Sequence, residues 1–359
     1  MTTASLLKAA EFGALRLRNR IVMAPMTRSR ADAAAVPTSE MVDYYAQRAS
    51  AGLIVAEGTS PSADGLGYCR TPAIYSAEQI AAWRQVTDAV HARGGQIVVQ
   101  LMHCGRVASR HNKPAGSRTL GPSAVPAQTE LFTDVAGMAP TEAPEAMSRE
   151  DIARTIADYR QAALNARAAG FDGVELHCTS GYLPMQFMSE NANQRDDEYG
   201  GSADNRVRFA REVLLAMSEA IGAERVGIRF CPANRFNDIA DSDPAATYSA
   251  LLRSLRGLNL AYLHIMRAHS SRIDAFSQAR AEFDGALIVN DGFEPDSAAD
   301  MVASGQADAV SFARHYIANP DLVERIAGGA TLAEFDRKTL YSPGPQGYTD
   351  YPSLLEEMA

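Results

Sequence analysis

The sequence predicts a (β/α)8 TIM barrel, an α/β fold in which eight parallel strands alternate with helices and close into a cylinder. Eight short apolar runs, rich in β-branched residues, alternate with helical patterns along the chain. They cover residues 21–24, 53–56, 97–99, 174–176, 226–228, 261–263, 287–289 and 309–312. Such runs are typical of parallel strands that are buried on both faces and joined by crossover helices.

Each apolar run stops at side chains of the types that bind ligands or catalyse reactions. These exits carry Thr27, Glu57 with Thr59, Gln100 with His103, His177 with Tyr182, Arg229, His264, Asn290 with Gly292, and Arg314. In a barrel of this kind the carboxyl ends of all strands share one mouth. We therefore expect residues that lie far apart in the sequence to meet there.

Helix starts are readable between the runs. Ser76 with Gln79, and Ser148 with Asp151, have the spacing of capping boxes, in which two side chains satisfy two free N–H groups. A buried stripe is expected on the second of these helices at Ile152, Ile156, Tyr159 and Ala163. Shorter helices are expected after Thr38, Ala203, Pro244, Pro295 and Pro320.

The chain is long enough for a barrel with insertions, so we expect residues 1–359 to form one domain. Two segments interrupt the alternation. Residues 103–147, after the third strand, are rich in Pro, Gly, Ser and Thr and are expected to form a lid over the mouth. Residues 266–283, after the sixth strand, are expected on the same side.

Composition excludes several classes of function. The chain has 46% hydrophobic and 21% charged residues, as globular proteins do, and a net charge of −9 that opposes nonspecific nucleic-acid binding. No apolar stretch approaches the roughly 18 residues of a membrane span, and the first residues do not resemble a signal peptide. We expect a cytoplasmic monomer or homodimer with no nucleic-acid or membrane partner.

The cysteines form no spacing typical of a metal site. Cys69, Cys104, Cys178 and Cys231 are scattered, without a C-x-x-C pair or a close Cys/His spacing. This pattern disfavours zinc and iron–sulfur sites, and a reducing compartment disfavours disulfides. We expect four free thiols and no metal.

His177 and Tyr182 are suited to polarising a carbonyl group and protonating a carbanion. The strand delivers His177 to its end, and a turn at Gly181 lets Tyr182 point back into the same cavity. A neutral His can donate a hydrogen bond to an oxygen, and Tyr can donate a proton. The alternative is a buried structural His beside a Tyr that closes a loop.

Gln100, Arg229 and Thr27 are suited to the edge of a planar heterocycle. A long amide can bind its oxygen and nitrogen atoms, and a permanent cation can stabilise the negative charge that builds up when such a ring is reduced. This set therefore indicates a flavin. A salt bridge at the barrel rim is the alternative for Arg229.

The turns after the seventh and eighth strands indicate a phosphate site. In this fold they usually supply backbone N–H groups and a helix N-terminus, and Arg314 adds a charge. Gly292 could instead satisfy only a tight turn, and Asp291 suits a phosphate only if its side chain faces away. The chain has neither G-x-G-x-x-G after its first strand nor G-x-x-x-x-G-K. A phosphorylated flavin held by a barrel fits both absences.

With these residues considered, the chain resembles the Old Yellow Enzyme family of flavin-dependent ene-reductases, closest to its pentaerythritol tetranitrate and N-ethylmaleimide reductase branch. The resemblance covers nearly the whole chain. It rests on NRIVMAPMTR at 19–28, YYAQRA at 44–49, VQL at 99–101, GFDGVELH at 170–177, NQR at 193–195, YGGS at 199–202, NR at 205–206, IANPDL at 317–322 and GYTDYP at 347–352.

The resemblance implies flavin mononucleotide (FMN) as cofactor, reduced by NADPH or NADH and reoxidised by an activated alkene. It places Pro25, Met26, Thr27, Gly58, Gln100 and Arg229 on the flavin ring, and Asp291, Gly292, Ala313 and Arg314 around the phosphate. It makes His177 the ligand of the substrate's carbonyl or nitro oxygen and Tyr182 the proton donor. Tyr68, Met102, Ser180 and Tyr348 are implied to line the substrate pocket.

Four positions depart from the family's pattern. Ser180 stands where a second His or an Asn is usual, which removes a donor to the substrate oxygen. Met102 stands where relatives of this branch have Trp, and leaves more flexible room. Asp291 and Ala313 replace a small residue and a Gly. Substrate scope is therefore expected to differ from that of the branch.

These features predict ping-pong reduction of activated C=C bonds in unsaturated carbonyls, nitroalkenes and maleimides, with nitro esters as further substrates. Hydride would come from the flavin and the proton from Tyr182. The alternative is a degenerate flavin-binding or ligand-binding barrel, marked by Ser180. A metal-dependent aldolase or a flavin-free phosphate isomerase is a further alternative, although no obvious metal-binding set follows the strands.

Overall fold

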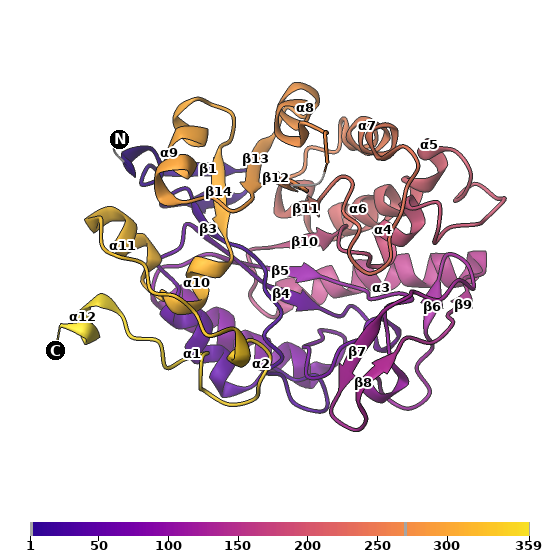
Figure 1. Cartoon of the computed structure of the whole chain (residues 1–359), viewed down its shortest axis with the longest axis horizontal. Coiled ribbons are helices and arrows are strands. Elements are labelled where there is room, and N and C mark those ends of the chain that lie inside the picture. Colours follow the sequence, from indigo (N-terminus) through magenta and orange to yellow (C-terminus); the bar gives the residue numbers. More distant parts are fainter. Residues whose placement is uncertain (1–2, 269–270, 359) are drawn as a thin grey trace.

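The computed structural model describes residues 3–268 and 271–358, and a closed barrel of eight parallel strands forms its centre (Figure 1). The strands are β3 (Ile21–Met23), β4 (Leu53–Thr59), β5 (Ile97–Leu101), β10 (Gly173–His177), β11 (Val226–Phe230), β12 (Tyr262–Met266), β13 (Ala286–Asn290) and β14 (Ala309–Phe312). The barrel closes where β14 pairs with β3. The predicted (β/α)8 fold is therefore confirmed, and each apolar run overlaps one strand.

Helices surround the barrel and connect its strands. The longer ones are α1 (Ser39–Gln47), α2 (Ala77–Ala92), α3 (Arg149–Ala168), α6 (Arg208–Ile221), α7 (Pro244–Leu255), α8 (Ala275–Glu282), α9 (Pro295–Ala303) and α11 (Leu322–Gly328). Shorter ones are α4 (Leu183–Met188), α5 (Ala203–Arg206), α10 (Arg314–Ala318) and α12 (Leu354–Glu357). The helices expected after Thr38, Ala203, Pro244, Pro295 and Pro320 are thus present, within two residues of the expected starts.

Both predicted capping boxes are confirmed. The Ser76 side chain accepts the Gln79 N–H and the Gln79 side chain accepts the Ser76 N–H, so α2 begins where the sequence indicates. Ser148 and Asp151 do the same for α3. The predicted stripe on α3 is buried at Ile152, Tyr159 and Ala163 and partly buried at Ile156.

A short hairpin covers the end of the barrel opposite the mouth. Strands β1 (Ala10–Phe12) and β2 (Leu15–Leu17) pair antiparallel. Phe12 and Leu15 pack in one apolar cluster with Leu53 and Tyr262, the first residues of β4 and β12. These three-residue strands are too short to be read from sequence periodicity.

The segment 103–147 contains four short strands. β7 (Glu130–Thr133) and β8 (Gly137–Pro140) form an antiparallel hairpin, which lies at the periphery of the molecule (Figure 1). β6 (Leu120–Gly121) pairs with β9 (Glu145–Ala146). Whether this segment moves as a lid stays a prediction. Within the second expected mouth-side segment, 266–283, α8 is described, and residues 269–270 lie outside the described part.

The C-terminal segment returns to the loop that follows β3. Arg30 donates to the carbonyl oxygens of Leu340 (2.9 Å) and Thr339 (3.0 Å), and Arg28 donates to that of Gly347 (2.7 Å). Both guanidinium groups are almost fully buried. Residues 339–347 are therefore attached to the barrel by charge-assisted hydrogen bonds.

All four cysteines are free thiols, as expected. Cys104, Cys178 and Cys231 are buried, and Cys69 is half-buried. Burial raises the pKa of the Cys178 thiol.

Candidate active site

The strand ends bring most of the expected ring-binding and substrate-binding residues to one end of the barrel. His177 is the last residue of β10, and Arg229 is its register partner on β11. Gln100 lies near the end of β5, opposite Glu175 of β10. The prediction that distant strand exits share one mouth is thereby confirmed for these side chains.

A hydrogen-bonded chain crosses the barrel interior below this mouth. Gln100 Nε2 donates to Glu175 Oε1 (2.8 Å), and Glu175 Oε2 lies 2.8 Å from His264 Nδ1. His264 Nε2 lies 2.8 Å from the Ser311 hydroxyl. Glu175, His264 and Ser311 come from the alternate strands β10, β12 and β14, as inward-facing side chains of such barrels do.

The charges of the buried groups in this hydrogen-bonded chain compensate one another. Burial and the nearby Arg229 cation together lower the pKa of His264 to about 4, so the ring is neutral at pH 7. Burial opposes ionisation of Glu175, but His264 and Arg229 together hold the pKa of its carboxyl below the usual value. An anionic Glu175 therefore offsets the buried Arg229 cation. The sequence showed these polar residues inside apolar strands but not their connection.

Arg229 has one hydrogen-bonding group free. Its Nη2 donates to Asn290 Oδ1 (2.9 Å) and its Nε to the sulfur of Met266 (3.2 Å). Its Nη1 is buried without a partner, and the described residues place no carboxylate in an ion pair with it. A buried unpaired donor on a cation is costly unless a ligand accepts from it. The alternative of a rim salt bridge is therefore not supported, and the site fits a ring with acceptor atoms.

The loop after β3 is held in place by a buried carboxylate. Glu57 Oε2 accepts the backbone N–H of Arg28 (3.3 Å), and the Tyr45 hydroxyl donates to Glu57 Oε1 (3.2 Å). Burial raises the pKa of Glu57 to about 7, although these hydrogen bonds and Arg28 oppose the rise. Pro25, Met26 and Thr27, the expected ring contacts, are half-buried in this loop.

Gly58 follows Glu57 and closely approaches Met102. A Cβ atom at Gly58 would lie 2.6 Å from the Met102 sulfur, so a larger residue requires Met102 to move. Met102 is itself buried and packs with Tyr68 and Tyr182 in one apolar cluster. Gly58, expected to contact the flavin, and Met102, expected to contact the substrate, are therefore in direct contact.

The expected phosphate residues follow two paired strands. Asp291 and Gly292 come after β13, and Ala313 and Arg314 come after its neighbour β14. Gly292 has no left-handed φ angle and open space at its Cβ position, so the turn itself does not require glycine. Arg314 is exposed at the start of α10.

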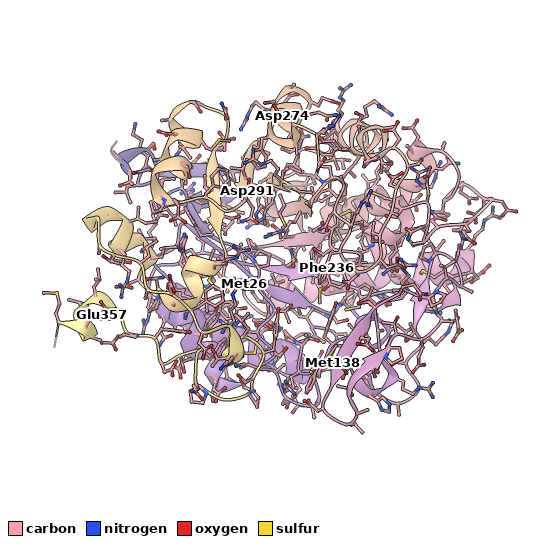
Figure 2. All side chains as sticks on the ribbon, in the orientation of Figure 1. Met26, Met138, Phe236, Asp274, Asp291 and Glu357 are labelled. Atoms are coloured by element: carbon pink, nitrogen blue, oxygen red, sulfur yellow. The ribbon has the colours of Figure 1, made fainter. Side chains whose placement is uncertain are left out.

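The Asp291 carboxylate turns towards its own backbone. It accepts the Gly292 N–H (2.8 Å) and the Arg267 Nε–H (2.7 Å). The Arg267 cation offsets the charge that would otherwise repel a phosphate. Asp291 lies near the start of β13's exit loop, as its label in Figure 2 indicates.

His177 and Tyr182 face each other, with ring centroids 4.9 Å apart. Burial and the nearby Arg229 cation lower the pKa of His177 to about 3, so the ring is neutral, and its Nδ1 has no protein partner. Burial raises the pKa of Tyr182 well above its usual value, so the phenol keeps its proton. The left-handed pair Ser180 (φ +58°) and Gly181 (φ +77°) makes the expected turn. A free imidazole nitrogen and a retained phenol proton are the groups that polarisation and protonation require.

A cavity of about 860 Å³ opens beside Tyr182. Besides Tyr182 it is lined by Thr27, Ser29, Tyr68, Cys69, Arg70, Glu130, Leu131, Phe132, Asp134, Met138, Phe236, Lys338, Tyr341, Ser342 and Pro343. Phe236 and Met138 are 60% and 59% exposed (labelled in Figure 2), so large apolar side chains stand free at its rim. Arg70 and Asp134 form an ion pair that ties the hairpin to the loop after β4. No motif or periodicity in the sequence pointed to Arg70, Asp134, Met138 or Phe236.

Tyr348 lies outside this lining. Its ring is fully buried and stacks on Tyr44, with centroids 4.0 Å apart, and the Arg30 guanidinium lies 4.7 Å from its centroid. Its hydroxyl is buried without a partner. The expected contact of Tyr348 with substrate therefore stays a prediction.

Among residues 3–268 and 271–358, no group of three or more His, Cys, Asp or Glu side chains is placed to hold a metal ion. Within the same residues, no helix is both long enough and apolar enough to span a membrane.

Comparison with known proteins agrees with this site. The model of the NADH:flavin oxidoreductase / NADH oxidase family matches residues 5–332. A probable flavin mononucleotide-dependent alkene reductase of Leishmania infantum is 44% identical over 97% of both chains. A 12-oxophytodienoate reductase 1 of Oryza sativa subsp. japonica is 40% identical over 98% of this chain and 93% of its own.

Solved structures extend the likeness to three dimensions. Morphinone reductase in complex with tetrahydroNAD has a TM-score of 0.93 at 42% identity, over 97% of both chains. The Old Yellow Enzyme homologue from Zymomonas mobilis has a TM-score of 0.93 at 38% identity, over 97% of this chain and 99% of its own. The narrower branch suggested by the sequence stays a prediction. The chain belongs to the NADH:flavin oxidoreductase / NADH oxidase family, the family of Old Yellow Enzyme.

Proposed function

We propose that this FMN-dependent, NAD(P)H-driven oxidoreductase reduces activated C=C bonds of small molecules, with Tyr182 as the proton donor and His177 as the ligand of the activating oxygen. One observation carries the proposal. The His177 and Tyr182 rings lie 4.9 Å apart beside a large cavity, at the strand end that also carries Arg229. The relatives named alkene reductase and 12-oxophytodienoate reductase support the same reaction class.

Gln100, Arg229, Gly58 and the residues 25–27 would hold the flavin ring. Arg229 Nη1 supplies a buried donor that no protein atom satisfies. The backbone after β13 and the Arg314 side chain would hold the phosphate. When bound, FMN supplies the hydride, which it receives from NAD(P)H.

His177 would bind the carbonyl or nitro oxygen of the substrate. Its neutral ring can donate one hydrogen bond, which becomes stronger as negative charge builds up on that oxygen. Ser180, in the family position of a second donor, is half-buried and has a short side chain. The oxygen would therefore depend mainly on His177.

Tyr182 would protonate the α-carbon. Because burial raises the pKa of its hydroxyl, the proton is present at neutral pH, and the transfer leaves a phenolate that the site must neutralise. Leu131, Phe132 and Met138 of the hairpin would shield this step from bulk water. Unsaturated carbonyls, nitroalkenes and maleimides are the expected substrates, and nitro esters further ones.

A single cavity would serve the nicotinamide and the alkene in turn. The two would then exclude each other and give parallel lines in double-reciprocal plots. Intersecting lines would rule out this order of events.

Stopped-flow absorbance of the holoenzyme tests the proposal. NADPH or NADH should bleach the flavin, and cyclohexenone should restore its colour. Tyr182→Phe should bleach at the normal rate but recover roughly 100-fold more slowly, since a positioned acid contributes at least about that factor. Tyr75→Phe, outside the cavity lining, is the matched control.

Two results would contradict the proposal. If the wild type bleaches but cyclohexenone does not restore the colour, the protein is a degenerate flavin-binding barrel. If Tyr182→Phe recovers as fast as the wild type, another group supplies the proton.

A further inference from the structure

Tyr182 is hydrogen-bonded to a second tyrosine. The Tyr182 and Tyr68 hydroxyl oxygens lie 3.1 Å apart, and the two rings meet edge to face at 86° with centroids 6.0 Å apart. Tyr182 is 8% exposed, whereas Tyr68 is partly exposed and lines the cavity beside it. Both side chains line the cavity, and Tyr68 is the more exposed of the two.

Asn237 donates a second hydrogen bond to the Tyr68 oxygen. Its Nδ2 donates to the Ser180 carbonyl oxygen (2.9 Å) and to the Tyr68 hydroxyl oxygen (3.3 Å). Because a carbonyl oxygen can only accept, the amide must present its NH₂ group to both partners. The Tyr68 oxygen accepts from Asn237 and also from the Tyr182 hydroxyl. Neither contact uses the Tyr68 hydrogen, which can therefore turn towards the Tyr182 oxygen once Tyr182 has given up its proton.

The loop that carries Asn237 is shaped for this contact. Asn237 and Asp238 both have left-handed φ angles, +59° and +60°, which Asn and Asp tolerate better than most residues. Arg106 Nη2 donates to the Asp238 carbonyl oxygen (2.5 Å), and Asn191 donates to the same oxygen (2.7 Å). The backbone next to Asn237 is thus held from two sides.

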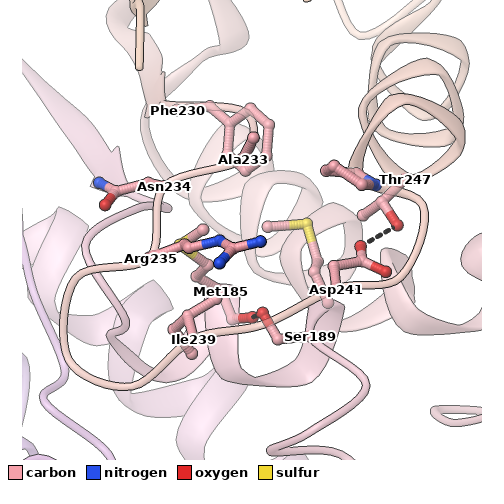
Figure 3. Close-up of a pocket in the computed structure, with 11 residues that line it drawn as sticks. Met185, Ser189, Phe230, Ala233, Asn234, Arg235, Ile239, Asp241 and Thr247 are labelled. Carbon is pink, nitrogen blue, oxygen red and sulfur yellow. Dashed lines mark hydrogen bonds between the residues drawn. The ribbon is translucent and has the colours of Figure 1, made fainter. Parts of the chain in front are cut away.

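Figure 3 shows the space behind the same loop. A second cavity, of about 60 Å³, lies between Arg235, Ile239 and the side chains of Met185 and Phe230. It is large enough for water, and Arg235 and Asp241 are the charged residues that line it. From the same loop, the Asn237 side chain reaches Tyr68.

We propose that Tyr68 returns the proton that Tyr182 gives to the substrate, and that Asn237 positions Tyr68 for this transfer. The inference rests on the proposed function. As the Tyr182 O–H bond breaks and the C–H bond forms at the α-carbon, the Tyr68 proton moves to the Tyr182 oxygen. A proton from bulk solvent, passed on by water in the cavity, then restores the Tyr68 hydroxyl, so the alkene takes up one solvent proton in all and no phenolate or hydroxide remains.

The Asn237 contact favours this direction of transfer. Burial raises the pKa of both phenols, to about 12 for Tyr68, so both hold their protons at neutral pH. The Asn237 N–H donates to the Tyr68 oxygen and stabilises a negative charge there, which supports proton transfer from Tyr68 to a Tyr182 phenolate.

A double-mutant cycle in the holoenzyme tests whether Tyr68 acts through Tyr182. Tyr68→Phe should slow recovery of the flavin colour by cyclohexenone on the order of 10-fold, and it should affect bleaching by NADPH less, because that step needs no proton from Tyr182. In the Tyr182→Phe background, Tyr68→Phe should add no further loss. An equal loss in both backgrounds would mean that Tyr68 only shapes the cavity, and no loss in the wild type would also overturn the relay.

A second measurement does not depend on alkene turnover. In holoprotein labelled at the tyrosine Cζ carbons, Asn237→Asp should shift the NMR resonances of both Tyr68 and Tyr182. The carboxylate removes the donor to the Tyr68 oxygen and instead accepts the Tyr68 hydrogen. This changes the oxygen to which Tyr182 donates, so the effect reaches Tyr182 through Tyr68. Asn234→Asp, which adds the same charge in the same loop and whose amide contacts Thr179 instead, is the control.

An unmoved Tyr182 resonance in Asn237→Asp, with a shifted Tyr68 resonance, would overturn the relay even if the enzyme reduces alkenes. Conversely, a shift of both resonances in a protein that does not reduce cyclohexenone would separate the hydrogen-bonded chain, which stands, from the proposed reaction, which fails.

Discussion

Glu175 and His264 are in hydrogen-bond contact inside the barrel, with 2.8 Å between Oε2 and Nδ1, although neither side chain is exposed to solvent. A buried carboxylate is tolerated only when its partners compensate for lost hydration. Here Gln100 and His264 supply hydrogen bonds, and the Arg229 cation supplies opposite charge. The Glu175 carboxylate thereby orients Gln100 and compensates the charge of Arg229, and both of these residues are expected to bind the flavin.

Glu175→Gln should therefore lower the free energy of unfolding of the holoenzyme by about 3 kcal/mol, because it leaves the Arg229 charge buried without its counter-charge. Urea unfolding followed by circular dichroism measures the loss. Glu219→Gln, on the exposed face of α6, should change stability by no more than about 0.5 kcal/mol. Equal values for the two variants would show that the barrel charge is compensated elsewhere.

Glu57 predicts a pH dependence of stability. Burial raises the pKa of its carboxyl in the folded protein to about 7, whereas the unfolded value is 4.5. Between these two pH values the folded state binds the extra proton, so the contribution of Glu57 to stability falls as pH rises through this window. The slope can reach about 1.4 kcal/mol per pH unit.

Glu57→Gln removes this titration. The difference in unfolding free energy between the variant and the wild type should therefore move in favour of the variant as pH rises from 5 to 7 and level off above. Denaturation curves at four or five pH values give this difference directly. A difference that is flat with pH would show that Glu57 is already ionised across the window.

Ser180→Asn should restore the second donor to the substrate oxygen. Asn tolerates the left-handed backbone that residue 180 adopts (φ +58°), so the replacement adds an amide without new strain. Phenol, whose oxygen mimics that of the substrate, should bind the oxidised holoenzyme roughly 10-fold more tightly, as one added hydrogen bond to a charged oxygen allows. Titration of the flavin spectrum measures this, and Ser180→Ala should leave the affinity almost unchanged.

Phe236→Ala and Met138→Ala should separate large from small substrates. Both side chains stand exposed at the cavity rim and can cover apolar surface of a bulky alkene. KM for benzylideneacetone should rise roughly 5-fold in each variant, while KM for cyclohexenone stays unchanged. Val135→Ala, exposed on the same hairpin but outside the cavity lining, is the control. A uniform rise for both substrates would assign these residues to general stability.

The barrel and its mouth could be predicted because they depend on periodic apolar runs and on the residues that end them. His177, Arg229 and Gln100 were found in this way, since a strand end fixes where a side chain begins. Glu175 could not be assigned, because inside a run buried on both faces the sequence does not say which residues point inward. Its hydrogen bond to His264 depends on the register between strands, which the sequence does not determine.

The residues of the cavity rim could not be predicted from the sequence for another reason. Phe236 lies in an irregular loop and Phe132 in a four-residue strand, where no periodicity indicates direction. Asn237 acts through a left-handed backbone that Asn permits but does not require. For Tyr348 the motif was recognised in the sequence, but the position of the ring was not. The ring stacks on Tyr44 and lies beside the Arg30 guanidinium.

The bonds from Arg28 and Arg30 to the carbonyl groups of residues 339–347 join two segments that are far apart in the sequence. Lys338, Tyr341, Ser342 and Pro343, which complete one wall of the cavity, are translated after all eight barrel strands. A nascent chain can thus close its cylinder of strands before this wall exists. The cavity would then be completed later than the barrel, and deletions within residues 338–347 would affect turnover sooner than folding.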